Sequence, residues 1–293
     1  MTRPCPGPLP PRKPRNALPQ GACDTHVHIL GPYAQFPQAP DRGYTAPEAP
    51  VDKLRQMMDT LGLARCVIVH VTAHGDDLRV TLDALRQLRP NARGIAIFNP
   101  NTADLEMNLL HQDGIRGIRL TPLIGDDPTF EDLERLTKRI ARLNWHLVLM
   151  PASPQSWLKL APRLSDLPVE VVLDHFAWRG WDIADSSGVN QPGFRALVDA
   201  AKTGRCWVKL AGPERFGKSA APRHADVLPY ARALVEAQPD RLIWGSDWPH
   251  VRSWDHPVPD DAALVELLAE WIPDETIRNR VLVDNPARLY GFK

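Results

Sequence analysis

Cys66-Val-Ile-Val-His70 and Val169-Glu-Val-Val-Leu173 are the stretches that decide the fold of this 293-residue chain. Both are too apolar for a strand with one solvated face, in which polar and apolar residues would alternate. Strands covered on both sides have this composition, and such strands are typical of parallel sheets. The two stretches therefore predict a parallel sheet.

The same kind of run recurs along the chain, because β-rich stretches alternate with longer helical patterns from residue 21 onward. Eight such units in fewer than 300 residues predict an α/β fold, a single (β/α)8 TIM barrel over residues 21–293, rather than an open doubly wound sheet. No G-x-G-x-x-G or P-loop motif follows any run, which disfavours a nucleotide-binding fold. The expected strands are residues 22–30, 65–71, 94–98, 115–120, 146–150, 169–174, 206–210 and 241–244. The expected helices are residues 51–61, 78–88, 103–112, 130–143, 154–160, 194–201, 225–237 and 261–271, with a final helix over 276–289.

The first 20 residues differ in composition from the rest of the chain. Seven of the 30 prolines fall there, together with Arg3, Arg12, Lys13 and Arg15 and no acidic residue. Such a segment cannot bury enough apolar surface to offset the entropy lost on ordering. We expect residues 1–20 to form an extended Pro-rich N-terminal arm, either mobile or strapped to the barrel. The arm lacks the apolar core of a signal peptide.

Charge and cysteine usage exclude several classes of protein. Lys and Arg number 35, as do Asp and Glu, which gives no electrostatic reason to expect nucleic acid as a partner. No run of about 18 apolar residues is present to span a membrane. The four cysteines contain no C-x-x-C pair, which argues against a disulfide framework and fits a reducing, cytoplasmic location. The oligomeric state is left open.

Chemistry-bearing residues gather at the expected strand ends. In a (β/α)8 barrel the active site lies at the carboxyl ends of the strands. His26 and His28 share one face of the first strand, so their imidazoles can form a metal site or polarise a carbonyl. Asp247 follows the last strand, where it can act as a general base. His175 follows the sixth strand. The alternatives are buried structural histidines and a structural carboxylate at position 247.

Three motifs together resemble a known family. They are Asp24-Thr-His-Val-His28, Asp174-His175 and Trp244-Gly-Ser-Asp-Trp-Pro-His250. In this order they resemble the amidohydrolase superfamily, and within it the branch typified by 2-pyrone-4,6-dicarboxylate lactonase, with sulfomuconolactone hydrolase and galactarolactone isomerase as relatives. The resemblance extends from about residue 20 to 290, with Arg116-Gly-Ile-Arg119 and Pro213-Glu-Arg215 as supporting pieces.

The resemblance implies a role for each matched residue. Asp247 would take a proton from water, and the resulting hydroxide would attack a lactone carbonyl. Donors at the carbonyl oxygen would be His26, His28 and His175, in the manner of an oxyanion hole. Arg119 and Arg215 would bind substrate carboxylates, for which the guanidinium fork is suited, and His74 would be a further substrate contact.

Two departures from the family pattern bear on the substrate. Where the dicarboxylate lactonase has a second arginine this chain has Gly125, and where it has a tyrosine this chain has Met150. We therefore expect a lactone with fewer or differently placed acidic groups. An arginine such as Arg179 or Arg252 could compensate from a loop.

The same comparison bears on metal. Metal-dependent members carry a lysine or glutamate at the fourth strand and a histidine at the fifth, where this chain has Arg119 and Met150. A fixed cation would repel a divalent ion. Metal-free catalysis, with no cofactor required, is therefore favoured. If a single divalent metal such as zinc is bound, its ligands would be His26, His28, His175 and Asp247.

These features predict a hydrolase that opens a carboxylated lactone in aromatic or sugar-acid catabolism. The substrate would be a small molecule similar to 2-pyrone-4,6-dicarboxylate, a muconolactone or a sugar-acid lactone. The alternatives are a metal-dependent decarboxylase or hydrolase of the same superfamily, a lactone isomerase, and a non-catalytic binding module.

Overall fold

The eight strands expected from the sequence form one closed parallel barrel. A computed structural model of the chain describes residues 2–97, 102–120 and 128–293. Within these residues the strands pair in chain order, each parallel to the next. This confirms the single (β/α)8 barrel. The strands are β1 (Cys23–Val27), β2 (Arg65–Val69), β3 (Ala92–Ile97), β4 (Ile115–Leu120), β5 (His146–Leu149), β6 (Val171–Leu173), β7 (Cys206–Leu210) and β8 (Leu242–Trp244).

The barrel closes between β1 and the residues that follow β8. Val27 and Trp248 form a parallel bridge, and the backbone N–H of His28 donates to the carbonyl of Trp248 at 2.8 Å. One step earlier, the N–H of Asp247 donates to the carbonyl of His26 at 2.9 Å. We call this junction between β1 and the residues after β8 the seam of the barrel. It carries three of the predicted catalytic residues, His26, His28 and Asp247.

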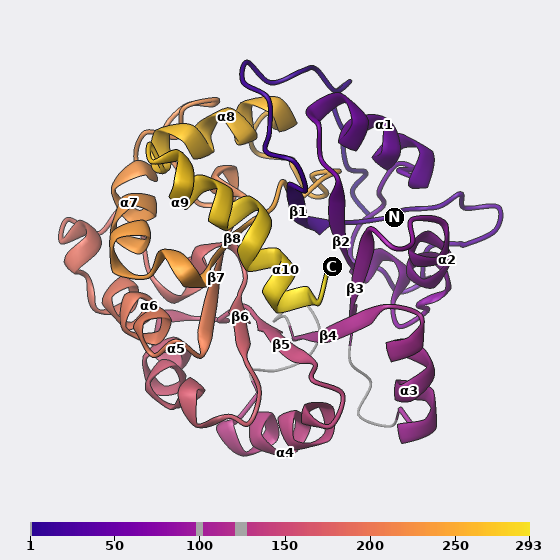
Figure 1. Ribbon diagram of the computed structural model, residues 1–293, viewed down its shortest axis with the longest axis horizontal. Helices are drawn as coiled ribbons and strands as arrows, with labels where there is room; N and C mark the ends of the chain where they lie inside the picture. Colours follow the sequence, from indigo (N-terminus) through magenta and orange to yellow (C-terminus); the bar gives the residue numbers. More distant parts are fainter. Residues whose placement is uncertain (1, 98–101, 121–127) are drawn as a thin grey trace.

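Helices surround the strands in a ring (Figure 1). Most contain a stripe of buried apolar residues, such as Leu133, Leu136 and Ile140 on one face of the fourth helix, which packs against the barrel. In the described part of the chain no helix is long and apolar enough to cross a membrane. The helices are α1 (Val51–Leu61), α2 (Arg79–Gln87), α3 (Asp104–Gln112), α4 (Phe130–Ala141), α5 (Pro154–Leu160), α6 (Pro192–Lys202), α7 (Leu228–Ala237), α8 (Asp261–Trp271), α9 (Glu275–Asn279) and α10 (Asn285–Tyr290).

The expected final helix over residues 276–289 is wrong in detail. The structure has α9, then a π-helical turn over Arg280–Asp284, then α10. Pro286 supplies the physical reason, because it has no N–H to donate to the carbonyl four residues earlier. The backbone widens there, and the N–H of Asn285 bonds to the carbonyl of Arg280 instead.

Apolar side chains fill the inside of the barrel as well as its outside. Val67 and Val69 of β2 point inward, while Cys66 and Ile68 pack in the layer shared with the helices. This alternation confirms that the strand is buried on both faces. The inner cluster consists of Cys23, Val67, Val69, Ile95, Val148, Val172, Trp207 and Ile243, together with Leu289, Tyr290 and Phe292 near the C-terminus.

The C-terminal residues cover the end of the barrel at which the strands begin. Arg93, near the start of β3, donates to the carbonyl of Tyr290 at 3.2 Å, and the side-chain amide of Asn285 donates to the carbonyl of Leu242 at 2.7 Å. Figure 1 shows α10 lying across the centre of the ring. The opposite end, where the strands finish, is the one left to form a site.

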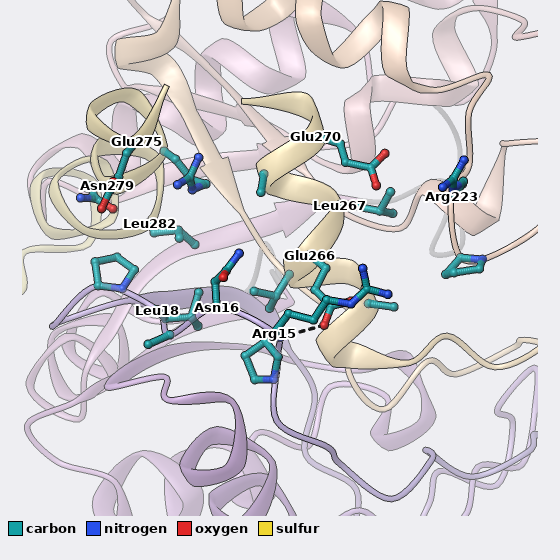
Figure 2. A pocket seen from close by; sticks show the side chains of 18 residues that line it. Arg15, Asn16, Leu18, Arg223, Glu266, Leu267, Glu270, Glu275, Asn279 and Leu282 are labelled. Carbon is teal, nitrogen blue, oxygen red and sulfur yellow. Dashed lines mark hydrogen bonds and ion pairs between the residues drawn. The ribbon is translucent and has the colours of Figure 1, made fainter. Parts of the chain in front are cut away.

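Residues 2–20 lie against the outside of the barrel. Arg12 forms ion pairs with Asp260 at 2.6 Å and with Glu266 of α8 at 2.9 Å, and the backbone N–H of Arg15 also donates to Glu266. Figure 2 shows Arg15 directed at Glu266 beside an outer pocket between this segment, α8 and α9. None of the predicted site residues lines that pocket. The division of the chain into an arm and a barrel at residue 20 stays a prediction.

Gly245 permits the close approach of β8 to β1. A Cβ at this position would lie 2.6 Å from the Cβ of His26 and 2.8 Å from its backbone nitrogen. We predict that Gly245→Ala lowers the free energy of unfolding by about 1–3 kcal/mol, because the strands must separate to admit the methyl group. Urea unfolding measures this change. Gly43→Ala is the control, since nothing lies within 4 Å of that position. Equal midpoints for Gly245→Ala and wild type would contradict the prediction.

Candidate active site

A pocket lies at the carboxyl ends of the strands and contains most of the predicted site residues. It is lined by residues that follow β1, β2, β5, β6, β7 and β8, together with Arg119 in β4. Four arginines contribute to it, so it favours anionic ligands. The lining consists of His28, Tyr44, Val71, Thr72, Arg119, Met150, His175, Trp178, Arg179, Arg215, Asp247, Val251 and Arg252.

The two histidines of the first strand converge on Asp247. Their rings lie edge to face with centroids 5.0 Å apart, as the period of a strand requires. The Nε2 atoms of His26 and His28 are each 3.4 Å from Oδ1 of Asp247. The expected grouping of an H-x-H pair with the aspartate after β8 is therefore present in space.

Asp24, the first residue of the same motif, holds this arrangement in place. Its Oδ1 accepts the backbone N–H of His26 and that of Ser246, both at 3.0 Å. It is fully buried, and burial raises its pKa to about 7 despite these hydrogen bonds. Asp24 thus joins β1 to the segment that carries Asp247.

Asp247 occupies a strained and highly charged position. Its φ of 69° lies in the left-handed region, which a residue with a Cβ adopts at a cost of about 1–3 kcal/mol. Burial alone would raise its pKa, but the Arg215 guanidinium and the His175 ring hold the pKa well below its usual value. Arg215 donates to Oδ2 through Nε and also lies against it through its terminal nitrogen. Oδ1 remains directed at the two histidines.

Arg215 therefore contacts the expected general base in addition to lining the pocket. Its terminal nitrogen also donates to the carbonyl of Val251 at 3.2 Å. Substrate binding by Arg215 stays a prediction.

His250 supports the Asp247 loop from behind. Its backbone N–H donates to the carbonyl of Asp247 at 2.8 Å, and its Nε2 lies 2.9 Å from Oδ1 of Asp261 at the start of α8. Burial alone would lower the pKa of His250, but the Asp261 carboxylate raises it above its usual value.

A buried charge network that we did not predict lies beneath the histidines. Asp174 is fully buried; its Oδ1 is 2.8 Å from Nζ of Lys209 and its Oδ2 is 3.0 Å from Arg119. Burial alone would raise the pKa of Asp174, but Lys209, His26 and Arg119 hold it well below its usual value. A lysine within the otherwise apolar run Cys206–Leu210 was the available signal in the sequence.

Lys209 favours a proton on one nitrogen of His26. Its Nζ lies 3.1 Å from Nδ1 of His26. An ammonium group has three donors and no lone pair, so this contact favours an Nδ1 that accepts and a neutral ring protonated on Nε2, whereas Oδ1 of Asp174, 3.3 Å from the same Nδ1, favours the opposite tautomer. Burial lowers the pKa of His26 well below its usual value, and the nearby Lys209 adds to this effect. When Lys209 is the donor to Nδ1, His26 presents an N–H towards Asp247.

His28 and His175 use Nδ1 in the opposite way. Nδ1 of His28 lies 2.7 Å from the carbonyl of Val69, and Nδ1 of His175 lies 3.3 Å from the carbonyl of Ala211. A carbonyl can only accept, so each Nδ1 is the donor. Burial lowers the pKa of His175 to about 4. The role of His26, His28 and His175 as oxyanion donors stays a prediction.

The expected metal-ligand set is divided between two groups among the described residues. His26, His28 and Asp247 place ligating atoms within 4.8 Å of one another, and so do His26, Asp174 and His175. His28 fits a ligand role, since its Nδ1 is held by a backbone carbonyl. His26 fits one when its proton lies on Nδ1, where Oδ1 of Asp174 at 3.3 Å can accept it and Nζ of Lys209 at 3.1 Å opposes it. Each of the two groups also has a positive charge next to it, because Lys209 contacts Asp174 and Arg215 contacts Asp247.

Three further positions named in the sequence analysis are His74, Met150 and Gly125. His74 does not line the pocket; its Nδ1 is 3.1 Å from the carbonyl of Pro37, and its ring is near those of Tyr33 and His70. Its substrate contact stays a prediction. Met150 does line the pocket, whereas Gly125 lies outside the residues that the structure describes.

Tyr44 and Thr72 line the pocket without having been predicted, and no motif in the sequence distinguishes them. The hydroxyl of Thr72 donates to that of Tyr44 at 3.4 Å. Both residues lie in the segments that follow β1 and β2.

Residues 23–292 match the sequence profile of the family described as Amidohydrolase. The chain belongs to the amidohydrolase family. It is 38% identical to a 4-sulfomuconolactone hydrolase of Rhizobium radiobacter over 98% of this chain and 96% of that protein. It is 36% identical to a 2-pyrone-4,6-dicarboxylate hydrolase of Comamonas testosteroni over 96% and 93% of the two chains.

A crystal structure shares the fold of this amidohydrolase over almost its whole length. It is that of a probable 2-pyrone-4,6-dicarboxylic acid hydrolase of Acinetobacter baumannii with citric acid bound. The TM-score is 0.79 at 25% identity, and the match covers 93% of this chain and 100% of that one. Together with the two relatives, it confirms the expected branch of the family.

The charge network generates a prediction for Lys209→Met. In the wild-type protein His26 carries its proton on Nε2; in the variant the proton moves to Nδ1, where Oδ1 of Asp174 lies 3.3 Å away and can accept it. Long-range ¹H–¹⁵N correlation spectra of histidine-labelled protein distinguish the two tautomers. His28 serves as the internal control, because its bond to Val69 is unchanged. A wild-type His26 protonated on Nδ1 would contradict the assignment.

Proposed function

We propose that this amidohydrolase opens a lactone that bears at least one acidic group, by adding water to the ring carbonyl. The observation that carries the proposal is the position of Asp247, whose Oδ1 faces Nε2 of both His26 and His28 at 3.4 Å in a pocket with four arginines. The names of the two relatives describe hydrolases of lactones that carry a sulfonate or carboxylate group, which supports this substrate class.

Asp247 acts as the base in the proposed mechanism. A water that donates to Oδ1 of Asp247, beside Nε2 of His28, loses its proton to that carboxylate as its oxygen adds to the carbonyl carbon. The N–H of His26 donates to the oxyanion that forms, and Arg119 adds positive charge nearby. Collapse of the tetrahedral intermediate breaks the ring C–O bond. Asp247 returns its proton to the departing oxygen, which leaves a carboxylic acid and a hydroxyl group.

The residues around the pocket support a substrate other than 2-pyrone-4,6-dicarboxylate itself. Met150 supplies no hydroxyl at the position where the sequence comparison expects a tyrosine. Arg179 and Arg252 line the pocket from the segments after β6 and β8, so positive charge is supplied from different positions. This arrangement supports a lactone whose acidic group lies elsewhere on the ring.

Catalysis without metal is part of the proposal. His26 already uses Nδ1 to accept from Lys209, and Arg215 already neutralises Asp247. The runner-up is a metal-dependent decarboxylase or hydrolase, which the convergence of His26, His28 and Asp247 favours. In that alternative His26 would bind the metal through Nε2 and carry its proton on Nδ1, so Lys209 could no longer donate to Nδ1.

Asp247→Asn tests the assignment of the base. We expect kcat to fall by about 100-fold or more, since an amide cannot accept the proton, while the fold persists because the amide has nearly the same shape. The assay follows ring opening of muconolactone-type and pyrone-type lactones in H₂¹⁸O, and the exposed α6 residue change Arg195→Met is the matched control. One ¹⁸O in the new carboxylate indicates hydrolysis, whereas an isomerase would form product without solvent label. A near-normal kcat in Asp247→Asn would refute the role of Asp247.

Metal content provides an independent test. We expect chelator-free protein to contain well below one equivalent of transition metal per chain and to retain its activity after dialysis against EDTA. Elemental analysis and the lactone assay measure these two quantities. Stoichiometric zinc whose removal abolishes turnover would instead support the metal-dependent alternative.

A further inference from the structure

Two arginines of the pocket have no acidic partner in the described part of the chain. Arg119 and Arg215 are each paired with a buried aspartate, and Arg119 shares Asp174 with Lys209. Arg179 and Arg252 contact aromatic rings instead: Arg179 lies 5.5 Å from the ring centroid of Trp178, and Arg252 lies 5.6 Å from that of Trp254. Both are half-buried. Their charge is therefore available to an anion that enters the pocket.

Arg252 is held in place by the N-terminal segment. Its backbone N–H donates to Sγ of Cys5 at 3.2 Å, and the indole N–H of Trp254 donates to the carbonyl of Pro4 at 2.8 Å. The guanidinium of Arg3 lies 4.9 Å from the ring centroid of Trp254, which Arg252 also contacts. Because the φ of Arg252 is 66°, its backbone needs such support to keep this conformation.

The same segment is tied to the other side of the pocket. Pro4 forms a parallel bridge with Thr45, in which the N–H of Cys5 donates to the carbonyl of Thr45 at 2.7 Å and the N–H of Thr45 donates to the carbonyl of Arg3 at 3.2 Å. Thr45 follows Tyr44, which lines the pocket. Residues 2–5 therefore connect two pocket-lining loops that are about 200 positions apart in the sequence.

We propose that Arg252 and Arg179 bind the anionic substituent of the substrate, a carboxylate or sulfonate, and that residues 2–5 position Arg252 for this contact. The proposal rests on the lactone hydrolase function proposed above and adds to it the residues that select an acidic substrate. Arg252 and Arg179 are specificity residues, and residues 2–5 act through Arg252 without touching the substrate. The ion pairs that Arg12 forms with Asp260 and Glu266 anchor the segment farther along, next to the contact of Arg15 seen in Figure 2.

The first experiment compares an acidic lactone with its neutral counterpart. Arg252→Met, Arg179→Met and a protein that lacks residues 2–8 are assayed with muconolactone and with its methyl ester. For the acid we expect KM to rise about tenfold or more in each, as for loss of a charge-assisted hydrogen bond, with kcat nearly unchanged. For the ester we expect little change. Arg195→Met, an exposed arginine of α6, is the control and should behave as wild type with both substrates.

The second experiment tests whether the N-terminal segment acts through Arg252. Removing residues 2–8 from the Arg252→Met protein should cause no further rise in KM, because the residue that the segment positions is already absent. Cys5→Ala, which keeps the segment but removes the acceptor of the Arg252 N–H, should raise KM for the acid in the same direction. Thermal unfolding of each variant identifies any general loss of folding. A full further loss in the double variant would overturn the positioning role.

A binding measurement separates this proposal from the proposed function. Calorimetry with isophthalate, a flat dianion with no ring ester, and with neutral isophthalamide requires no turnover. Wild type should bind isophthalate in preference to the diamide, and Arg252→Met should reduce that preference by about tenfold. If no lactone is hydrolysed but this preference is found, the function fails and the anion site stands. Equal losses for acid and ester, or for dianion and diamide, would overturn the anion site.

Discussion

The carboxylate of Asp24 is the contact on which the rest of the site depends. It accepts backbone N–H groups from both β1 and the segment after β8, and so joins the first strand of the barrel to the last. The same seam brings Gly245 against His26, which leaves no room for a side chain between them. Because the base and its two imidazole neighbours all lie along this seam, closing the barrel and assembling the candidate active site are the same event.

Charge balance beneath the pocket is the second constraint. Asp174 and Asp247 are both buried, and a buried carboxylate without a partner would cost several kcal/mol, about the size of the whole stability of a domain in the worst case. Lys209 and Arg119 both pair with the first, and Arg215 pairs with the second. Lys209 favours a proton on Nε2 of His26, while backbone carbonyls accept from Nδ1 of His28 and of His175.

The fold and the convergence of the site could be predicted from the sequence because both follow from local patterns. Apolar runs such as that over residues 66–70 indicate strands covered on both faces, and strand ends in a barrel meet at one edge. That reasoning places Asp247, His26, His28 and His175 together, as the structure does. It fails at the C-terminus, where the effect of Pro286 on backbone hydrogen bonding makes a π-turn out of an apparently regular helix.

The remaining features depend on side-chain direction across the barrel, which no local pattern encodes. Lys209 could be recognised as unusual in an apolar strand, but its contact with His26 spans 183 positions and exists only in the closed barrel. Arg215 presents the same difficulty, since a guanidinium at a strand end can reach either a substrate or a neighbouring carboxylate. The first five residues carry no signal of their role at all, because a proline-rich segment reveals only that it cannot form a helix or a core. Its partners Thr45 and Trp254 belong to opposite ends of the chain and become neighbours only when the barrel closes. The function of such a segment therefore follows from the closed barrel and not from its own composition.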